Sequence, residues 1–292
     1  MSDYYNLPTK TLENKFLKLD YLAEAGPRLV RLSVAGSEAN LFAEVPESKT
    51  PTPWGDYHFL GGHRLWHSPE SLPRTYVPDN DNLVISEQPD GVILGCSEEP
   101  TGISKSIEIH LAADQPKITL IHKLENTGLW PIELAAWALS QLSLGGTAIF
   151  PLPIGDVDPA GLLPNRQMSL WPYTRLTDER LELHDDFIIF HARPQLPPFK
   201  IGYFSQHGWA GYYNHGVFLR KTQDLHPELP YPDFNCTTES YCNDQFIELE
   251  TLGPLQTLKP GESTTLTEIW ELFTDISEVP ELSEEMRSAF SS

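Results

Sequence analysis

Apolar and polar residues alternate through much of the chain, and a period of two residues is typical of β-strands with one buried face. In Ser106–Leu111, the residues Ile107, Ile109 and Leu111 alternate with polar ones. Lys117–Leu124 follows after the turn sequence AADQP, so the two runs are predicted to pair as antiparallel strands. The same reasoning predicts further strands at Lys15–Tyr21, Arg28–Val34, Pro131–Leu139, Thr147–Phe150, Leu181–His184, Phe187–His191, Lys200–Phe204, Val217–Lys221, Gln245–Thr251 and Thr264–Phe273.

Helical periodicity is scarce, and only Val279–Phe290 is predicted to form a short helix. Two stretches, 46–82 and 151–178, are rich in Pro, Trp and Tyr and are predicted to be long loops. No internal repeat or low-complexity linker divides the chain. Many short strands with little helix predict a single all-β domain over residues 1–292, a large antiparallel sandwich or barrel.

The charge balance limits the classes of partner. The chain has 20 basic and 41 acidic residues, a formal net charge of −21. Such a chain is repelled by phosphate backbones and by anionic lipid surfaces, so neither nucleic acid nor a membrane is an expected partner. Hydrophobic residues make up 40% of the chain, which is ample for a packed core. The −21 charge is expected to be spread over a solvated surface.

The cysteines and the start of the chain bear on location. The three cysteines, Cys96, Cys236 and Cys242, form no CxxC motif, and reduced thiols in a cytoplasm are the simplest interpretation. A Cys236–Cys242 disulfide in an oxidising compartment is the alternative. The opening MSDYYNLPTK lacks the basic and apolar regions of a secretory signal, so a cytoplasmic location is expected.

Three segments, in order along the chain, carry a family resemblance: Asn14–Glu44, Ser104–Leu139 and Phe246–Leu272. They are similar to three parts of the galactose-mutarotase-like superfamily, which includes the aldose 1-epimerases. The first segment resembles the opening strand with its Gly-x-Arg turn, and the second resembles the central meander with its N-T-G turn. The third resembles the closing L-E-T strand with its L-x-P-G-E turn. GGHRLWHSPE (Gly61–Glu70) resembles one subgroup of that superfamily. The resemblance implies a large antiparallel β-sandwich with a carbohydrate-binding groove.

The resemblance also implies roles for single residues. Glu250 stands at the position of the epimerase general base, in the L-E-T strand, and Arg64 matches an arginine that contacts the sugar. The general acid, a histidine, is missing, because Ala136 and Trp137 stand where the family has Asn and His. Loss of an acid removes a proton transfer that contributes about 10²–10⁴-fold to such a rate. Either another residue supplies the proton, or the protein binds sugar without epimerising it.

The segment His207–Gly216 concentrates histidine, tryptophan and tyrosine within ten residues. Amphipathic rings suit sugars, which present apolar C–H faces beside hydroxyl groups. His215 is therefore the first choice for a replacement acid, and Trp209 and Tyr213 are candidate sugar-binding residues. The alternative is a pair of core strands with an aromatic filling.

Glu248 and Glu250 are two residues apart and share one face of their predicted strand. Two carboxyl groups on one face can supply a base and an acid, because each raises the pKa of the other. The alternative is a solvated strand face. Trp66 and Trp137 are candidate stacking platforms for a sugar, although a tryptophan more often belongs to the core.

The motif around His63 and Arg64 offers hydrogen-bond donors for a sugar or a carboxylate. His63, His67 and Glu70 have a spacing that a helix could use for zinc, but the flanking Gly and Pro favour a loop. The oxygen-rich run Asp79–Asn82 lacks the remaining ligands of a calcium loop, so an Asx turn is favoured. No metal and no cofactor is expected.

The favoured hypothesis is a carbohydrate-binding protein that acts as an epimerase or mutarotase on a neutral sugar, with Glu250 as base and His215 or His63 as acid. The alternatives are a non-catalytic sugar-binding protein, in which Trp137 stacks the ligand, and an enzyme that uses the groove for a non-sugar substrate. We expect Arg64, Trp209, His215 and Glu250 to line one cavity. The sequence leaves open the identity of the sugar and the oligomeric state.

Overall fold

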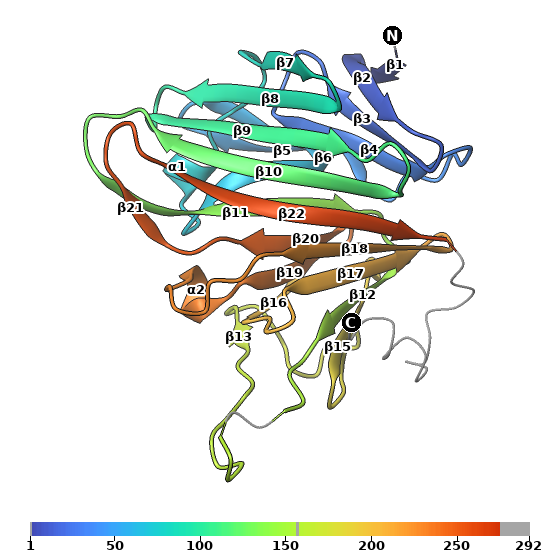
Figure 1. Cartoon of the computed structure of the whole chain (residues 1–292), viewed down its shortest axis with the longest axis vertical. Coiled ribbons are helices and arrows are strands. Elements are labelled where there is room, and N and C mark those ends of the chain that lie inside the picture. Colours follow the sequence, from blue (N-terminus) through green and yellow to red (C-terminus); the bar gives the residue numbers. More distant parts are fainter. Residues whose placement is uncertain (1, 156–157, 275–292) are drawn as a thin grey trace.

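The chain folds into two antiparallel β-sheets packed against each other, in a computed structural model that describes residues 2–155 and 158–274. The first sheet has twelve strands and the second has ten (Figure 1). Helix is confined, within these residues, to two segments of four residues each, none of them long enough to span a bilayer. The predicted all-β class and antiparallel β-sandwich are therefore confirmed.

The strands of the first sheet follow the order β1 (Ser2–Tyr4), β2 (Leu7–Glu13), β3 (Leu17–Leu22), β4 (Arg28–Val34), β6 (Gly55–Ser68), β11 (Ile132–Leu142), β20 (Ile247–Leu252), β19 (Thr238–Cys242), β16 (Phe199–Tyr203) and β13 (Ser169–Leu170). Two further strands pair with β6 and β11: β5 (Glu44–Thr52) and β21 (Gln256–Leu258), respectively. The strands of the second sheet follow the order β14 (Leu181–Leu183), β15 (Phe187–His191), β12 (Thr147–Pro151), β17 (Trp209–Asn214), β18 (Val217–Gln223), β22 (Ser263–Phe273), β10 (Lys117–Asn126), β9 (Ile103–Leu111), β8 (Gly91–Glu98) and β7 (Val84–Gln88). The helices are α1 (Leu72–Thr75) and α2 (Pro232–Asn235).

The core lies between the two sheets, where the apolar face of each alternating strand meets the other sheet. β9 and β10 pair antiparallel, as their patterns predict, and Ile107 and Ile109 are fully buried in this core. Residues that alternate with them, such as Glu108, reach the outside of the sheet. The period-two pattern therefore located the strands whose outer face is polar.

The predicted long loop at 46–82 is wrong over most of its length. β5 and β6 occupy residues 44–68 apart from a two-residue turn, and α1 follows shortly after. The alternation is hidden because the second half of β6 is buried on both of its faces. One face meets the core, and the other meets the side chains of the candidate site described below.

Two adjacent glycines allow β6 to change its pairing partners. Gly61 and Gly62 have φ angles of 89° and 71°, and their backbones lie against β5 and β4. A Cβ atom on Gly61 would lie 1.9 Å from the carbonyl oxygen of Ala43, and one on Gly62 would lie 1.9 Å from that of Leu29. Only glycine satisfies both the left-handed backbone and this close approach.

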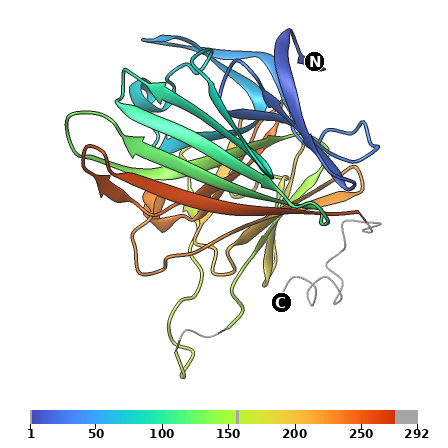
Figure 2. The same cartoon turned by 45° about the horizontal axis from the view of Figure 1, so that its top comes forward.

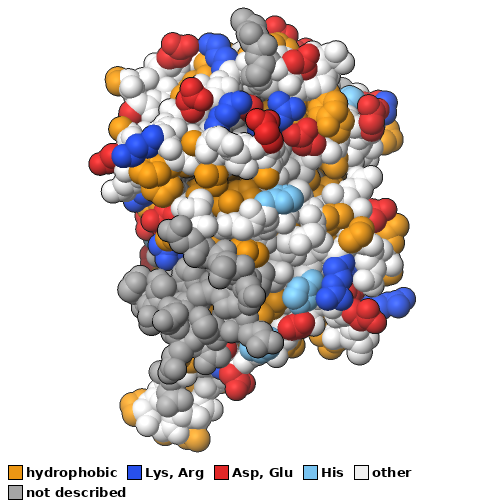
Figure 3. Space-filling view, turned by 90° about the vertical axis from the view of Figure 1, so that its right-hand side faces the viewer, with side chains coloured by type: hydrophobic (Ala, Val, Ile, Leu, Met, Phe, Trp, Pro, Cys, Tyr) orange, Lys and Arg blue, Asp and Glu red, His pale blue; other side chains and the backbone are white. Residues whose placement is uncertain are grey.

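The predicted loop at 151–178 is largely irregular in its described part, with only the two-residue strand β13 inside it. Part of it projects from the sandwich (Figures 1 and 2). This segment carries exposed apolar residues, among them Leu162, and charged side chains of both signs are scattered over the face shown in Figure 3. The predicted helix at Val279–Phe290 lies outside the described residues.

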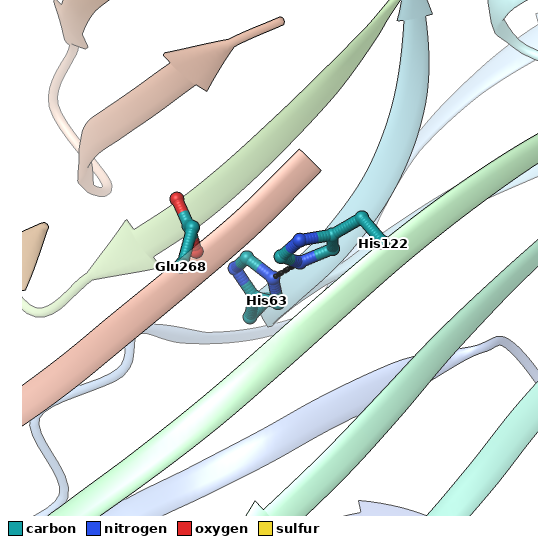
Figure 4. Close-up of side chains that lie close together, drawn as sticks. All are labelled: His63, His122 and Glu268. Atoms are coloured by element: carbon teal, nitrogen blue, oxygen red, sulfur yellow. Dashed lines mark hydrogen bonds between the residues drawn. The ribbon is translucent and has the colours of Figure 1, made fainter. Parts of the chain in front are cut away.

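A buried hydrogen bond between two histidines joins the sheets. Nε2 of His63 on β6 lies 2.7 Å from Nε2 of His122 on β10 (Figure 4). Nδ1 of His122 lies 3.0 Å from the carbonyl oxygen of Leu266, so this nitrogen carries a proton and Nε2 of His122 is the acceptor. His63 therefore donates from Nε2, and its Nδ1 accepts from the Ser140 hydroxyl at 2.9 Å. Both rings are neutral, and each of their four nitrogen atoms has a hydrogen-bond partner.

Glu268 completes this group, and its own partners explain why the three side chains form a polar bridge. The ligand atoms of His63, His122 and Glu268 lie within 4.8 Å of one another. However, the Lys221 ammonium lies 3.1 Å from one Glu268 oxygen, and the Trp270 indole donates to the other at 2.9 Å. The carboxylate that a metal ion would need as a ligand is thus already paired with an ammonium group and an indole N–H.

Charged residues also fill the core at the α1 side of the molecule. The buried Arg28 guanidinium binds Asp79 at 3.0 Å, and Lys105 binds Glu98 at 2.7 Å. His67 lies 3.6 Å from Glu98 on its other side. The Asp79 carboxylate is thus paired with an arginine, as expected for a structural role, and His67 faces the core rather than a ligand.

The histidine bridge predicts a specific dependence of stability on pH. Burial lowers the pKa of both His63 and His122 below 6.5, so the unfolded chain binds more protons as the pH falls through 6.5. Each histidine should therefore cost the folded state up to about 1.4 kcal/mol per pH unit as the pH falls from 6.5 towards its lowered pKa in the folded state. We expect the His122→Gln variant to lose stability less steeply than wild type over this range, measured by urea unfolding.

The comparison with wild type isolates the bridge, because the buried carboxyl groups with raised pKa values are common to both proteins and cancel. The control is His184→Asn, at a surface side chain that is 45% exposed, and it should keep the wild-type pH dependence. Parallel loss of stability in wild type and His122→Gln would contradict the assignment.

Candidate functional site

The floor of the candidate site is the outer face of five central strands of the first sheet, β6, β11, β20, β19 and β16. Arg64 pairs with Leu139, which pairs with Glu250 on the next strand, and Glu250 pairs with Glu239. Residues directly opposite in antiparallel strands point to the same face. By the same reasoning these residues form a second row on that face: Gln141, Glu248, Tyr241 and Lys200.

A cavity of about 230 Å³ lies over this floor. Charged and polar groups enter it from the strands and from the segments that follow them, including Arg64, Lys200, Glu248 and Asn243. Its aromatic lining residues are Phe59, Trp66, Tyr76, Trp137, Tyr173, Tyr241 and Phe246. The combination of rings with a few convergent polar groups is typical of a small-molecule site.

Arg64 and Glu248 form a buried ion pair that lines the cavity. Nη2 of Arg64 donates to Oε1 of Glu248 at 2.9 Å, and the Gln141 amide donates to the same oxygen at 3.0 Å. The guanidinium lies 4.2 Å from the Trp66 ring centroid, so its face packs on the indole. Burial raises the pKa of Glu248 to about 7, although Arg64 acts in the opposite direction. Glu248 can therefore exist in either protonation state near neutral pH.

Lys200 holds two carboxyl groups together beside this pair. Its Nζ lies 2.7 Å from Glu239 and 2.9 Å from Glu250, and all three side chains are buried. The ammonium also lies 4.8 Å and 4.6 Å from the ring centroids of Trp137 and Trp171. The two carboxyl groups raise the pKa of Lys200, so it remains charged, and burial raises the pKa of Glu239.

Glu250, the predicted base, is engaged below the cavity and does not line it. Its Oε2 accepts hydrogen bonds from the Lys200 ammonium and from the Trp137 indole, both at 2.9 Å, and its side chain is fully buried. Trp137 and Glu250, which the sequence resemblance aligns with the family's acid and base, are thus hydrogen-bonded to each other. Glu248 is the carboxyl group on this strand that faces the cavity.

The structure brings together Arg64, Trp66, Trp137 and Glu248, which all line the cavity, and places Glu250 beneath it. The prediction that His63 binds sugar is wrong. Side chains alternate between the two faces of β6, and that of His63 points into the core, where it contacts His122. The Arg64 guanidinium lies over the Trp66 ring and the Lys200 ammonium over the Trp137 ring, so a cation covers one face of each indole.

The predicted residues Trp209, Tyr213 and His215 belong to β17 of the second sheet and the turn after it. The expectation that Trp209 and His215 line one cavity with Arg64 is therefore wrong. Trp209 and Tyr213 on β17 alternate with Tyr212, which belongs to the main core, so they face away from the first sheet. Trp209 packs against Phe187 as part of an aromatic cluster. His215 is exposed in the turn between β17 and β18, at a φ angle of 53°. The alternative of an aromatic filling was correct for this segment.

Sequence reasoning missed Lys200, Tyr173 and Tyr241 as site residues. Lys200 begins a predicted strand, and Tyr241 lies in a segment where no strand was predicted. Tyr173 comes from the long irregular segment and is 38% exposed. The available signal was the run WPYT in a proline-rich loop, since aromatic residues in long loops indicate function.

Neither known family models nor curated protein sequences match the chain. Solved structures do. A candidate aldose 1-epimerase from Escherichia coli K12 superimposes with a TM-score of 0.55 at 14% identity, over 92% of this chain and 99% of that one. A galactose mutarotase-like protein from Lactobacillus casei gives 0.53 at 12% identity, over 91% and 100%.

A TPR-domain containing protein from Parabacteroides distasonis gives a TM-score of 0.60 at 17% identity, over 95% of this chain but only 50% of that one. Similarity at these identities establishes the fold and leaves activity open. The chain therefore has the fold of the galactose mutarotase-like proteins, as its sequence resemblance predicts.

The environment of Glu248 predicts a carboxyl group that titrates near neutrality. With glutamate labelled at the side-chain carboxyl carbon, NMR should show one resonance with a midpoint near pH 7 that is absent from the Glu248→Gln variant. The Arg64→Met variant should move this midpoint upward, because the guanidinium favours the ionised carboxylate. A Glu248 midpoint near the ordinary 4.5 would contradict this description of the site.

Proposed function

We propose that this chain binds a neutral carbohydrate in the cavity over β6, β11 and β20. The observation that carries the proposal is the convergence of the Arg64–Glu248 pair with seven aromatic side chains in one cavity of about 230 Å³. Aromatic rings suit the C–H faces of a sugar, and the edge of the ion pair and Asn243 offer partners for its hydroxyl groups. The fold supports the proposal by analogy only.

The preference for a neutral sugar follows from how the two cations are used. Glu248 neutralises Arg64, and Glu239 and Glu250 surround Lys200. A carboxylate or phosphate on the ligand would compete with these buried carboxyl groups for the two cations and would be repelled by them. Glu70, also at the cavity, would repel such a ligand further. Hydroxyl groups, which are uncharged, avoid this repulsion.

An aldose epimerase needs a base and an acid that both reach the sugar. Among the described residues, no histidine lines the cavity, and the Trp137 indole N–H that replaces the family's acid does not ionise usefully. Glu250 is held by Lys200 and Trp137. These contacts favour a sugar-binding protein over an epimerase of the usual mechanism.

A second candidate function rests on Glu248. Because its pKa is raised to about 7 and it faces the cavity, Glu248 has the protonation behaviour of a general acid or base. An isomerase or other sugar-converting enzyme on this site would use Glu248, with Arg64 as its charge partner, in place of Glu250.

We also propose a reducing, cytoplasmic compartment. All three cysteines are free and buried in the structure, and burial raises the pKa of Cys96 and Cys242 to about 11. Thiols of this kind are unreactive and act as small apolar core residues.

Binding can be tested by titration calorimetry and saturation-transfer NMR with glucose and galactose, beside glucose 6-phosphate and glucuronate. We expect the neutral sugars to bind at least about tenfold more tightly than the anionic ones. A penalty of about 1.4 kcal/mol in the binding free energy of the anionic sugars is enough to give that factor. The Trp130→Ala variant, at a ring that is 78% exposed outside the cavity, is the control and should bind as wild type does. Tighter binding of the anionic sugars would contradict the proposed neutrality of the site.

Catalysis can be tested by polarimetry of fresh α-glucose and α-galactose solutions with purified protein. We expect no acceleration of mutarotation that approaches the usual enzymatic range of about 1–10³ s⁻¹. Turnover in that range would contradict the binding-protein proposal. The variants Glu248→Gln and Glu250→Gln would then identify the responsible carboxyl group, because the true base should lose about 10²–10⁴-fold in rate.

A further inference from the structure

A second cavity, of about 410 Å³, adjoins the first. The two share four lining residues, Glu70, Tyr76, Trp137 and Lys200, so they lie side by side. The second cavity adds Trp171 from the long irregular segment and Asp233 from α2. A single monosaccharide in the first cavity would leave this second space to solvent.

The backbone at the edge of the second cavity is strained. Asp233, Phe234 and Asn235 have φ angles of 51°, 62° and 72°, so three consecutive residues with side chains occupy the left-handed region. Such runs are rare because each L-residue there crowds its own Cβ against the following carbonyl oxygen. Strain of this kind concentrates at functional sites, where the surrounding structure holds it in place.

Hydrogen bonds from neighbouring elements hold this strained turn. The Ser169 hydroxyl donates to the carbonyl oxygen of Asp233 at 2.9 Å, and the Gln167 amide donates to that of Phe234. The backbone N–H of Tyr231 donates to the Asn235 side chain at 3.0 Å. As a result Asp233 lines the cavity, and the Phe234 ring beside it is 85% exposed.

The side chains of the second cavity match those of the first in chemical type. Trp171 offers an aromatic ring, whose position is stabilised by the Lys200 ammonium 4.6 Å from its centroid. The carboxyl groups of Asp233 and Glu70 offer acceptors for hydroxyl groups. Among the described residues, each cation that lines the two cavities has a carboxylate partner, so the same preference for neutral ligands holds in both.

We propose that the second cavity is a sugar subsite, so that the ligand of this protein is a neutral disaccharide or a longer glycan rather than a monosaccharide. One sugar unit occupies the cavity at Arg64 and Glu248, and the next lies between Trp171 and Asp233. Trp137 and Lys200, shared by both cavities, lie at the junction where the glycosidic bond crosses. This inference rests on the proposed carbohydrate binding.

The test compares monosaccharides with disaccharides by titration calorimetry on the full chain. The probes are methyl glucoside and methyl galactoside against maltose, cellobiose and lactose. We expect at least one disaccharide to bind about tenfold or more tightly than the matching monosaccharide, because a second stacked unit adds contacts of the aromatic type.

Variants in each cavity separate the two subsites. Trp171 lines only the second cavity and Tyr241 only the first. Trp171→Ala should lower disaccharide affinity by about two- to tenfold and leave monosaccharide affinity unchanged, whereas Tyr241→Ala should lower both. Trp130→Ala is the control and should change neither. If Trp171→Ala loses the β-sheet circular dichroism spectrum of the wild type, Asp233→Asn provides a second variant. Asparagine tolerates the left-handed backbone at this position.

The outcomes distinguish the inference from the proposal beneath it. Equal affinities for monosaccharides and disaccharides, or a Trp171→Ala variant that binds both as wild type does, would overturn the second subsite and leave carbohydrate binding intact. If Asp233→Asn is the deciding variant, an unchanged ratio of disaccharide to monosaccharide affinity would overturn the second subsite. Binding of none of the five sugars would overturn the proposed function and the subsite together.

Discussion

The alternation of side chains along β6 is the constraint on which both the core and the site depend. His63 points inward and donates to His122 on the second sheet, and the next residue, Arg64, points outward and donates to Glu248. A shift of one residue in register would exchange the two and leave a guanidinium in the core. Gly61 and Gly62 fix that register, because only they permit the close approach to β5 and β4. The cavity therefore exists only where the sheet is paired as observed.

How much of the fold the sequence could predict depended on which strand faces meet water. β9 and β10 each have a buried face and an exposed face, so period-two alternation located them and their pairing. The alternation disappears in β6, where residues on both faces are buried, and the glycines and prolines nearby suggested a loop. A strand that serves a core and a cavity at once lacks the pattern that identifies a strand.

The family resemblance indicated Arg64, which lines the cavity, and Glu250, which does not; Glu248 was identified because it shares a strand face with Glu250. No sequence pattern shows that Lys200, on β16, engages Glu250 on β20 and so removes it from the cavity. His215 had a suitable residue type and neighbours, yet β17 belongs to the other sheet. Residue chemistry can be read locally, whereas convergence depends on the order of strands in the sheet.

The origin of the cavity's parts bears on how this protein could diverge. Its floor consists of paired strands whose charged side chains satisfy one another, so a change there disturbs several buried partners at once. Its rim comes from connecting segments, which carry Glu70, Tyr173 and Asp233 and take little part in the ladder of either sheet. Substitutions in the rim can alter the shape and chemistry of the cavity while the paired floor stays constant. The architecture thus separates what must be conserved for folding from what is free to vary for recognition.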